Sequence, residues 1–509
     1  MGTPGNAIAP LGLTLDRVVT YWSEKCPERL ALEHDAADGW EGITWRQFES
    51  YIAGATDYLG HSTAPGDIAG VVCDNGFEFH ILVNALWRCG TSVLLIDRSW
   101  GPAIVEDLLR LTDCPVLYCK NWGVQLGASR AVRRDYPARR EGAVRQTDFT
   151  GDLDVTAIYA TTSGTTDNPK CVAISHRKIR AAYRACLAVH NFSGIREAAS
   201  LFDLNSLGVL GVCFLLPREI GAATRVFPSF TVANIRATWD AVLHSSIGFV
   251  YLVPPLVRLL NTMRSKPQQA PRLLAFCASA PVQRMELRKL EAKFPVTAFN
   301  SYGLTELTFA VFFGCRDDEG LATDSIGYPV GIEARIVNDS ESVVSGPGRG
   351  ELHLKGPMLT DGYLHNETAT NLAWDGAWFR TGDIAERDAA GRYFICGRKK
   401  DTVLRGGVTY YLHELEHYVR RAPAVVDACA FKGRDLPSGD ELCVVVQVNH
   451  PKNPEDLLKW IRDNLGENKV PNVLIVWEHA LPRNSNGKVV RHVLARLYLA
   501  GELAGAGRA

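Results

Sequence analysis

The sequence predicts an α/β protein with a large N-terminal domain of layered βα-type subdomains, a small β-barrel-like part, and a small α+β C-terminal domain. Three observations predict this fold. Strand-like runs alternate with helical patterns to about residue 330, short strands with Gly-rich turns follow, and the pattern changes again after residue 399. A chain of 509 residues with 46% hydrophobic residues is long enough to bury more than one core.

Parallel sheets are expected in the N-terminal domain. Residues 67–97 contain an apolar run, a turn at 74–76, a helical pattern that ends near Gly90, and a β-branched run, which together predict one βαβ unit. The stretch SIGFVYLVPPLVRLLNTM passes from strand to helix, RLLAFCASA is a strand that enters a loop, and residues 281–294 have helical spacing. This alternation is typical of parallel strands covered by helices.

The strand pattern shortens from about Ile332. The segments EARIVND, RGELHLKG and GRYFICGR predict an antiparallel sheet or small barrel. After GRKKDTVLRGG we predict a helix over 412–421, a strand near Ala428, a helix over 454–465, and NVLIVWEH as the last strand. The predicted domains are therefore residues 1–399 and 400–509.

Charge and cysteine usage limit the class of function. A formal net charge of −1 provides no general field for nucleic acid or anionic lipid, so a small-molecule ligand in a local site is expected. Thirteen cysteines without a C-x-x-C pair indicate a reducing cytoplasm rather than a disulfide framework or zinc ribbon. The N-terminus lacks signal-peptide features, and no apolar run reaches the roughly 20 residues of a membrane span.

A hydroxyl-rich loop, YATTSGTTDNPKC at residues 159–171, indicates a site for anionic oxygens. Hydroxyl and backbone N–H groups donate hydrogen bonds, Gly164 lets the backbone approach closely, and Lys170 adds positive charge. The sequence contains neither a P-loop nor a dinucleotide fingerprint. By itself, this composition is equally typical of a Ser/Thr-rich surface turn.

Three further segments follow this loop in order: FNSYGLTEL at 299–307, WFRTGDIAERDAAGRYFICGRKKD at 378–401, and LPRNSNGKVVR at 481–491. With them, most of the chain resembles the adenylate-forming superfamily of acyl-CoA ligases, firefly-type luciferases and adenylation domains of peptide synthetases. The resemblance implies an enzyme that uses ATP and Mg²⁺, in which a carboxylate attacks the α-phosphorus and displaces pyrophosphate. It also implies a C-terminal domain that rotates between the half-reactions.

The resemblance implies nucleotide-binding roles for residues that match the family's motifs. The cradle for the β- and γ-phosphates would consist of Thr162, Ser163, Gly164, Thr165 and Thr166, with Lys170 nearby. The adenine slot would consist of Ser279, Ala280 and Pro281 opposite Asn300, Ser301, Tyr302 and Gly303. Asp383 is expected to bind the ribose hydroxyls, assisted by Arg398.

The resemblance also implies the catalytic groups. Glu306 is expected to bind Mg²⁺ and Thr305 to contact the α-phosphate. Lys488 is expected to bridge the substrate carboxylate and the α-phosphate, and Lys400 to serve as the hinge. Asp167 and Cys171 stand where the family usually has glycine, and the Asp167 charge would weaken ATP binding unless it points away.

A competing motif, HELEH at residues 413–417, matches the H-E-x-x-H pattern of zinc proteases. On a helix it would place His413 and His417 one turn apart, with Glu414 as the base. The same stretch corresponds to the first helix of the family's C-terminal domain, and the remaining histidines suggest no third ligand. We therefore expect no zinc.

Residues 200–214, SLFDLNSLGVLGVCF, bear on the acyl acceptor. Many acyl- and aryl-CoA ligases carry His where Asp203 stands, whereas amino-acid adenylation domains carry Asp, which pairs with the substrate's α-ammonium. Asp203 therefore indicates an amine: either the activated acid is an amino acid, or Asp203 accepts the proton of an incoming amine. The second arrangement resembles the discrete amide bond synthetases. A third interpretation has Asp203 cap a turn or pair with an arginine.

Aromatic residues predict the kind of acid. Phe309, Phe312 and Phe313 follow Glu306 and are expected near the acyl pocket, together with Phe202 and Leu207, which would suit an aromatic acid. The three phenylalanines that follow Glu306 are equally compatible with a strand core.

The expected protein is an aryl carboxylate ligase that forms an amide. An acid-CoA ligase is the nearest alternative, followed by an amino-acid adenylation enzyme that loads a separate carrier protein. The chain continues from Lys488 only to residue 509, so no fused carrier domain is expected. The expected partners are thus a carboxylic acid and an amine or thiol, with neither nucleic acid nor membrane.

Overall fold

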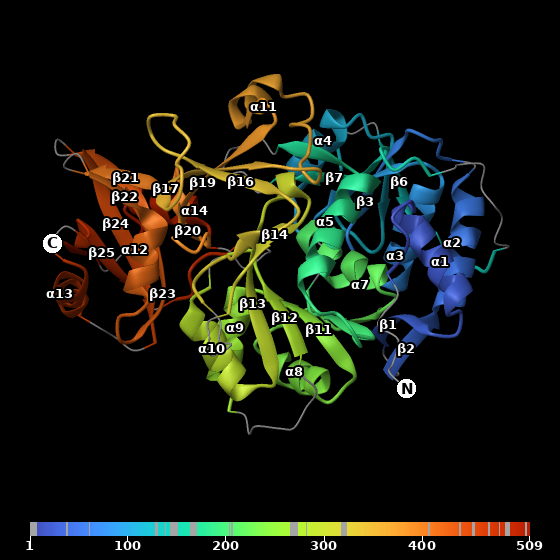
Figure 1. Ribbon diagram of the computed structural model, residues 1–509, viewed down its shortest axis with the longest axis horizontal. Helices are drawn as coiled ribbons and strands as arrows, with labels where there is room; N and C mark the ends of the chain where they lie inside the picture. The colour runs from blue at the N-terminus through green and yellow to red at the C-terminus, as the bar shows by residue number, and fades with distance from the viewer. Residues whose placement is uncertain are drawn as a thin grey trace. The chain divides into compact units, whose positions relative to one another are not determined.

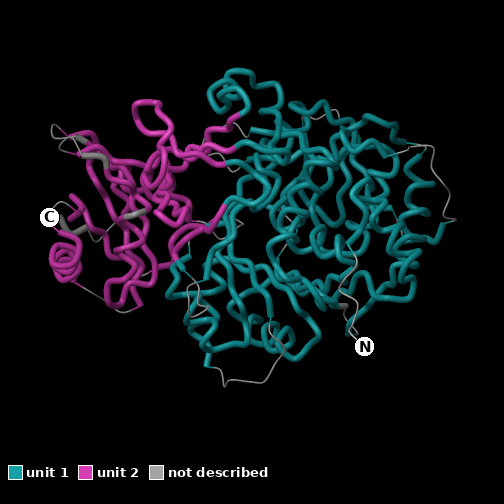
Figure 2. The backbone as a smooth tube through the Cα atoms, in the orientation of Figure 1, with its two compact units in different colours: residues 1–323, 329–333, 355–377 teal, residues 324–328, 334–354, 378–509 magenta. Residues whose placement is uncertain are grey.

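The computed structural model of the protein consists of two compact units. The units are residues 1–323, 329–333 and 355–377, and residues 324–328, 334–354 and 378–509 (Figure 2). The residues described are 8–36, 39–60, 62–127, 131–137, 139–142, 151–162, 170–202, 204, 207–264, 273–280, 282–316, 323–405, 408–436, 439–449, 453–466, 469–477, 479–483, 489–503 and 506–508. The predicted domain boundary at 399–401 lies within the second unit and stays a prediction.

The first sheet of the first unit carries the hydroxyl-rich loop. Its described strands, in spatial order, are β6 (Val132–Asp135), β5 (Val116–Cys119), β3 (Ile68–Val72), β4 (Ser92–Ile96), β7 (Thr156–Thr161) and β8 (Cys171–Ser175). All neighbours are parallel except β7 and β8, which are antiparallel. The helix α3 (Phe77–Arg88) connects β3 to β4, which confirms the predicted βαβ unit (Figure 1).

The second sheet of the first unit is also mostly parallel. Its described strands within this unit run in the order β14 (Ala310–Phe313), β13 (Val296–Gly303), β12 (Leu273–Cys277), β11 (Ile247–Leu252), β9 (Glu197–Ser200), β10 (Ala223–Val226), β1 (Leu30–Ala36) and β2 (Gly39–Thr44). The pairs β1–β2 and β13–β14 are antiparallel. The predicted strand-to-helix passage is confirmed as β11 followed by α9 (Pro254–Thr262).

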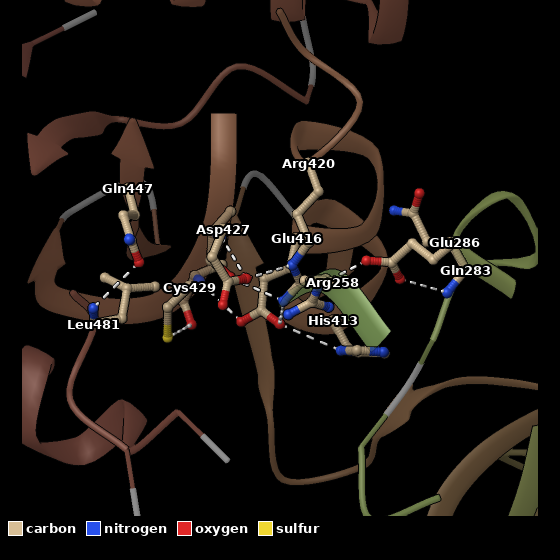
Figure 3. Close-up of polar contacts among 12 residues, drawn as sticks. Arg258, Gln283, Glu286, His413, Glu416, Arg420, Asp427, Cys429, Gln447 and Leu481 are labelled. Atoms are coloured by element: carbon tan, nitrogen blue, oxygen red, sulfur yellow. Dashed lines mark hydrogen bonds and ion pairs between the residues drawn. The ribbon is translucent and has the colours of Figure 1, made fainter. Parts of the chain in front are cut away.

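Helices connect the strands of both sheets in the first unit (Figure 1). The remaining described helices of this unit are α1 (Leu15–Lys25), α2 (Trp45–Leu59), α4 (Pro102–Leu111), α5 (His176–Val189), α6 (Leu207–Leu210), α7 (Leu216–Glu219), α8 (Ile235–Leu243), α10 (Arg284–Lys293) and α11 (Glu367–Ala373). A π-helical turn, η1 (Gly211–Leu215), joins α6 to α7. At the start of α10, the Gln283 N–H and Arg258 both donate to the Glu286 carboxylate, which joins α9 to α10 (Figure 3).

The second unit contains two strand-rich parts. The first is the group β16 (Glu333–Val337), β17 (Gly348–Lys355), β19 (Trp378–Arg387) and β20 (Tyr393–Arg398), in which β17–β19 and β19–β20 are antiparallel. The second is a sheet of β21 (Thr402–Arg405), β22 (Val408–Tyr411), β23 (Val425–Leu436), β24 (Gly439–Val448), β25 (Val473–Trp477) and β26 (Ala506–Arg508). Its helices are α12 (Leu412–Val419), α13 (Pro454–Leu465) and α14 (Arg491–Leu499).

Both faces of β24 are buried. Val444 and Val446 pack in a cluster with residues of α12 and α13, whereas Cys443 and Val445 pack in a second cluster with residues of α14. Because successive strand residues point to opposite faces, this alternation places helices on both sides of the sheet. The predicted helix over 454–465 is confirmed, but the prediction that NVLIVWEH is the last strand is wrong, because β26 follows it and pairs with β25.

Arg180 of α5 anchors the N-terminal segment. Its guanidinium donates twice to the Glu219 carboxylate, at 2.9 Å each, and to the carbonyls of Pro10 and Leu13. The Arg180 and Glu219 side chains are 2% and 1% exposed. A buried carboxylate needs a counter-charge, so this pair is a structural requirement of the first unit.

Replacing Arg180 by methionine should lower the free energy of unfolding by about 3–5 kcal/mol, because the Glu219 carboxylate stays buried after its main partner is removed. The denaturant midpoint measured by circular dichroism checks this expectation. Arg177→Met, on the same helix but paired with the exposed Asp154, is the control and should leave the midpoint almost unchanged. Equal shifts in the two variants would contradict the role assigned to Arg180.

Candidate active site

The two described ends of the hydroxyl-rich loop lie side by side. In the hairpin β7–β8, Thr161 pairs with Cys171, and the Thr162 N–H donates to the Lys170 carbonyl at 2.9 Å. The cradle residues Ser163, Gly164, Thr165 and Thr166 lie outside the described residues, as does Asp167. The Cys171 side chain is fully buried in an apolar cluster, and burial raises the pKa of its thiol to about 12. Cys171 therefore has a packing role in β8.

Glu306 and Lys170 both contact Tyr363, Glu306 through the hydroxyl and Lys170 through the ring. The Tyr363 hydroxyl donates to Glu306 Oε1 at 2.8 Å, and Lys170 Nζ lies 4.5 Å from the centroid of the Tyr363 ring. Both contacts lie within the first unit. Sequence reasoning missed Tyr363, because its segment, DGYLHN, reads only as a turn.

The short 3₁₀ helix η2 (Thr305–Leu307) presents Thr305 and Glu306. Thr308, which ends it, has a φ of 66°, a strained conformation for a β-branched residue, and its hydroxyl donates to the Met358 carbonyl at 2.8 Å. Glu306 is 9% exposed, and no hydrogen bond to its Oε2 is found among the described residues. A carboxylate with one oxygen bonded and a second oxygen that no described residue bonds fits the hard-oxygen site that Mg²⁺ requires.

The predicted adenine-slot segments leave one edge of the second sheet together. Cys277, the last residue of β12, pairs with Asn300 of parallel β13, so the residues that follow β12 lie at the same edge as the last residues of β13. Ser279 and Ala280 follow β12, with Ser279 at a φ of 77°, and Pro281 lies outside the described residues.

The β13 side of this edge is firmly packed. Asn300 and Ser301 are buried there, and the Tyr302 ring meets the edge of Phe312 at 5.7 Å. Gly303 is required by packing, since a Cβ there would lie 2.4 Å from the Phe309 carbonyl. The nucleotide-binding roles of these residues stay predictions.

In the second unit, Asp383 and Arg398 are neighbours on paired strands. They are register partners in β19 and β20, and Arg398 Nε lies 2.9 Å from Asp383 Oδ1. The guanidinium therefore orients the buried carboxylate. This proximity agrees with the helping role predicted for Arg398, although the ribose contact itself stays a prediction.

A second carboxylate supports the backbone of β19 next to Asp383. Glu351 accepts a hydrogen bond from the Gly382 N–H at 3.2 Å and another from Lys399 Nζ at 2.9 Å. Burial acts to raise the pKa of Glu351, but His353 and Lys399 outweigh it and lower that pKa to about 2. Glu351 is therefore ionised at neutral pH and connects Gly382 of β19 to Lys399, the residue before Lys400.

Asn75 anchors the chain on both sides of Asp203, which itself lies outside the described residues. The Asn75 side chain donates to the Phe202 carbonyl at 3.3 Å and accepts from the Leu204 N–H at 2.9 Å. The Phe202 ring packs edge-to-face against Phe230. Sequence reasoning missed Asn75, because its place in the turn after β3 indicates only a turn.

The other predicted pocket residues are packed against described neighbours. Phe309 meets the Tyr183 ring edge-to-face at 5.2 Å, and Phe312 is fully buried against Tyr302. Leu207 is buried at the start of α6. Burial favours the strand-core interpretation for Phe312, and its place in an acyl pocket stays a prediction.

The HELEH histidines of α12 face charged side chains. His413 Nδ1 lies 3.2 Å from Glu416 Oε2, and Arg421 donates to His417 Nε2 at 2.8 Å. Among the residues whose side chains are described, no group of three His, Cys, Asp or Glu residues could hold a metal ion. The described geometry therefore offers no support for a zinc site.

Glu416 is the centre of a buried ionic network in the second unit (Figure 3). Besides His413, it accepts from Arg491 at 2.7 Å and from Arg420 at 3.4 Å. Burial acts to raise the pKa of Glu416, but Arg491, His413 and Arg420 hold it well below its usual range. Glu416 therefore stays charged and joins α12 and α14 to β23, whose Ala430 N–H donates to it at 2.9 Å.

The same network anchors both sides of the segment that carries Lys488. Arg483, on one side, pairs with Asp427, which also binds Arg420 at 2.7 Å. Arg491, on the other side, pairs with Asp401 at 2.7 Å as well as with Glu416. Lys488 and residues 484–487 lie outside the described residues. The predicted hinge, Lys400, lies next to Asp401 in the connection between β20 and β21.

Comparison with sequence families identifies both parts of the chain. Residues 19–364 match the model described as AMP-binding enzyme, and residues 414–488 match the model described as AMP-binding enzyme C-terminal domain. The oxalate–CoA ligase of Arabidopsis thaliana is 25% identical over 513 residues, which cover 96% of this chain and 99% of that protein.

Solved structures share the fold. The anthranilate CoA ligase AuaEII in complex with anthranoyl-AMP matches with a TM-score of 0.82 at 18% identity, covering 96% of this chain and 99% of that one. The O-succinylbenzoate coenzyme A synthetase MenE from Bacillus subtilis, in complex with ATP and a magnesium ion, matches with a TM-score of 0.80 at 21% identity, covering 93% and 98%. These structures confirm the predicted α/β fold, and the two family models confirm the predicted superfamily.

Replacing Glu351 by glutamine should make the free energy of unfolding of the second unit depend less on pH in the acidic range. A carboxyl whose pKa is lower in the folded state stabilises the fold above its unfolded pKa of 4.5, and this contribution disappears as the pH falls toward 2. The free energy of urea unfolding, measured across this pH range, should therefore fall less steeply in the variant. Glu333→Gln, which removes an exposed partner of Lys355, is the control. Parallel curves for Glu351→Gln and the native protein would contradict the role of Glu351.

Proposed function

Because the chain belongs to the AMP-binding enzyme family and is an ATP-dependent adenylate-forming ligase, we propose that it activates an aromatic carboxylic acid as acyl-AMP and transfers the acyl group to an amine. The observation that carries the adenylation step is the arrangement of Lys170 and Glu306 around Tyr363. It places a cation from the phosphate loop and a carboxylate suited to Mg²⁺ on one rigid support.

In the first half-reaction, a carboxylate oxygen of the acid forms a bond to the α-phosphorus of ATP while the bond to the β-phosphate bridging oxygen breaks and pyrophosphate leaves. Thr162 and Lys170 bind the departing phosphates, and Glu306 would hold the Mg²⁺ that supplies positive charge against them. Asp383, oriented by Arg398, binds the ribose. Lys488 approaches the α-phosphate from the C-terminal domain and stabilises the charge that develops there.

In the second half-reaction, the amine nitrogen bonds to the acyl carbon, and AMP leaves with the electrons of the acyl–phosphate bond. An ammonium has no lone pair for this attack, so a base must take its proton. Asp203 supplies this base, and Asn75 holds the backbone on either side of it through Phe202 and Leu204.

We place the reaction in a reducing cytoplasm, because all thirteen cysteines are free thiols.

A thiol is the second candidate acceptor. The oxalate and anthranilate relatives are named as CoA ligases, which supports transfer of the acyl group to CoA. The two acceptors place different requirements on Asp203. An amine acceptor needs a carboxylate that pairs with it and takes its proton, whereas a thiol acceptor does not.

Incubation with ATP, Mg²⁺ and a panel of aryl acids, with CoA, simple amines or no acceptor, distinguishes these functions by mass spectrometry. We expect amide in preference to thioester. Asp203→Asn should retain pyrophosphate release but lower amide yield by about 10²–10⁴-fold, the usual contribution of a general base. Preferential thioester formation would favour the CoA ligase, and an unchanged amide yield in Asp203→Asn would remove the base assignment.

Lys488→Ala should abolish adenylate formation while largely preserving the use of preformed acyl-AMP, because the ammonium stabilises only the first transition state. Pyrophosphate exchange into ATP measures the first step, and amide formation from synthetic acyl-AMP measures the second. Lys459→Ala, which alters an exposed lysine of α13 in the same unit, is the control. Equal loss of both steps in Lys488→Ala would refute its assignment to one half-reaction.

A further inference from the structure

We propose that Tyr363 is a positioning residue that joins metal binding to phosphate binding. Its hydroxyl orients the Glu306 carboxylate and its ring holds the Lys170 ammonium. This inference rests on the proposed function, since it assumes that Glu306 binds the Mg²⁺ that accompanies ATP.

The hydroxyl restricts the Glu306 carboxylate. Glu306 lies in a helix of only three residues, and its terminal torsion has no strongly preferred value of its own. Donation from Tyr363 to Oε1 at 2.8 Å selects one orientation of the carboxylate, leaving Oε2 for a metal. Partners of this kind, which bond a metal ligand without touching the metal, typically change metal affinity by 10–100-fold when removed.

The ring restricts the Lys170 ammonium. Lys170 Nζ lies 4.5 Å from the ring centroid, within the distance at which a cation is attracted to an aromatic face. A cation over the ring also withdraws electron density from the phenol, which makes its O–H a stronger donor to Glu306. The two contacts of Tyr363 therefore reinforce each other.

The backbone around Tyr363 is bonded to the same two segments that its side chain joins. The Leu364 N–H donates to the carbonyl of Cys171, the residue after Lys170, at 2.8 Å. The Thr360 N–H donates to the Glu306 carbonyl at 2.9 Å. These bonds hold the backbone around Tyr363 against Cys171 and Glu306. The Tyr363 side chain therefore contacts Glu306 and Lys170 from a fixed backbone position.

Two substitutions separate the two contacts. Tyr363→Phe removes the hydroxyl and retains the ring, whereas Tyr363→Leu removes both. The assay is equilibrium binding of a fluorescent ATP analogue, titrated with Mg²⁺ in the absence of any acid. In Tyr363→Phe, the half-saturating Mg²⁺ concentration should rise by about 10-fold or more, while affinity for the analogue without Mg²⁺ stays unchanged. Tyr363→Leu should also lower the affinity without Mg²⁺ by about 2–5-fold.

A double-mutant cycle tests whether the hydroxyl acts through Glu306. In a Glu306→Gln background, Tyr363→Phe should add no further rise in the Mg²⁺ requirement. Tyr58→Phe, which alters an exposed tyrosine of α2 in the same unit, is the control for the substitution itself. Because Tyr363→Phe retains the ring and its packing on Trp374, the test of the hydroxyl does not depend on whether Tyr363→Leu folds.

The outcomes separate this inference from the proposed function. If the native protein binds the analogue with Mg²⁺ and Tyr363→Phe has the same Mg²⁺ requirement, the inference is overturned, even if the variant unfolds at a lower temperature. If the native protein shows no Mg²⁺-dependent nucleotide binding, the proposed function is overturned instead.

Discussion

The hydrogen bond from Tyr363 to Glu306 joins positions 57 residues apart and determines where the candidate metal ligand stands relative to the hydroxyl-rich loop. A nucleoside triphosphate carries several negative charges close together. The groups that bind it come from different parts of the chain and must be held close to one another. In the proposed site, the segment of residues 358–364 holds such groups together. It bonds to η2 through Thr360 and to β8 through Leu364, and Tyr363 then contacts Glu306 and Lys170.

The second unit contains a buried carboxylate that is stabilised by neighbouring cations. Glu416 would be costly to bury alone, but Arg491, Arg420 and His413 surround it and keep it ionised. Two arginines of this network, Arg483 and Arg491, stand on either side of the segment that carries Lys488. The network therefore fixes the described residues on both sides of this segment within their own unit.

Elements with strong local signals were predicted well from the sequence. The helix α13 was predicted over its observed range because Pro454 and its apolar spacing mark a helix, and the unit of β3, α3 and β4 was predicted from its change of periodicity. The strand β26 was missed because its three residues have no strand pattern and pair only because β25 offers an edge. The HELEH motif shows the opposite case, since His413 and His417 are spaced for a metal but face Glu416 and Arg421.

By itself, the sequence determined the fold class, the superfamily and the order of the nucleotide-binding motifs, because periodicity and short motifs are local properties of the chain. Only the tertiary structure decided which side chains support these motifs. Tyr363, Asn75 and Glu351 carry no local signal, and each acts through hydrogen bonds to residues that are distant in sequence. Such contacts depend on the register of strands and the packing of separate segments, which the order of residues along one stretch does not reveal.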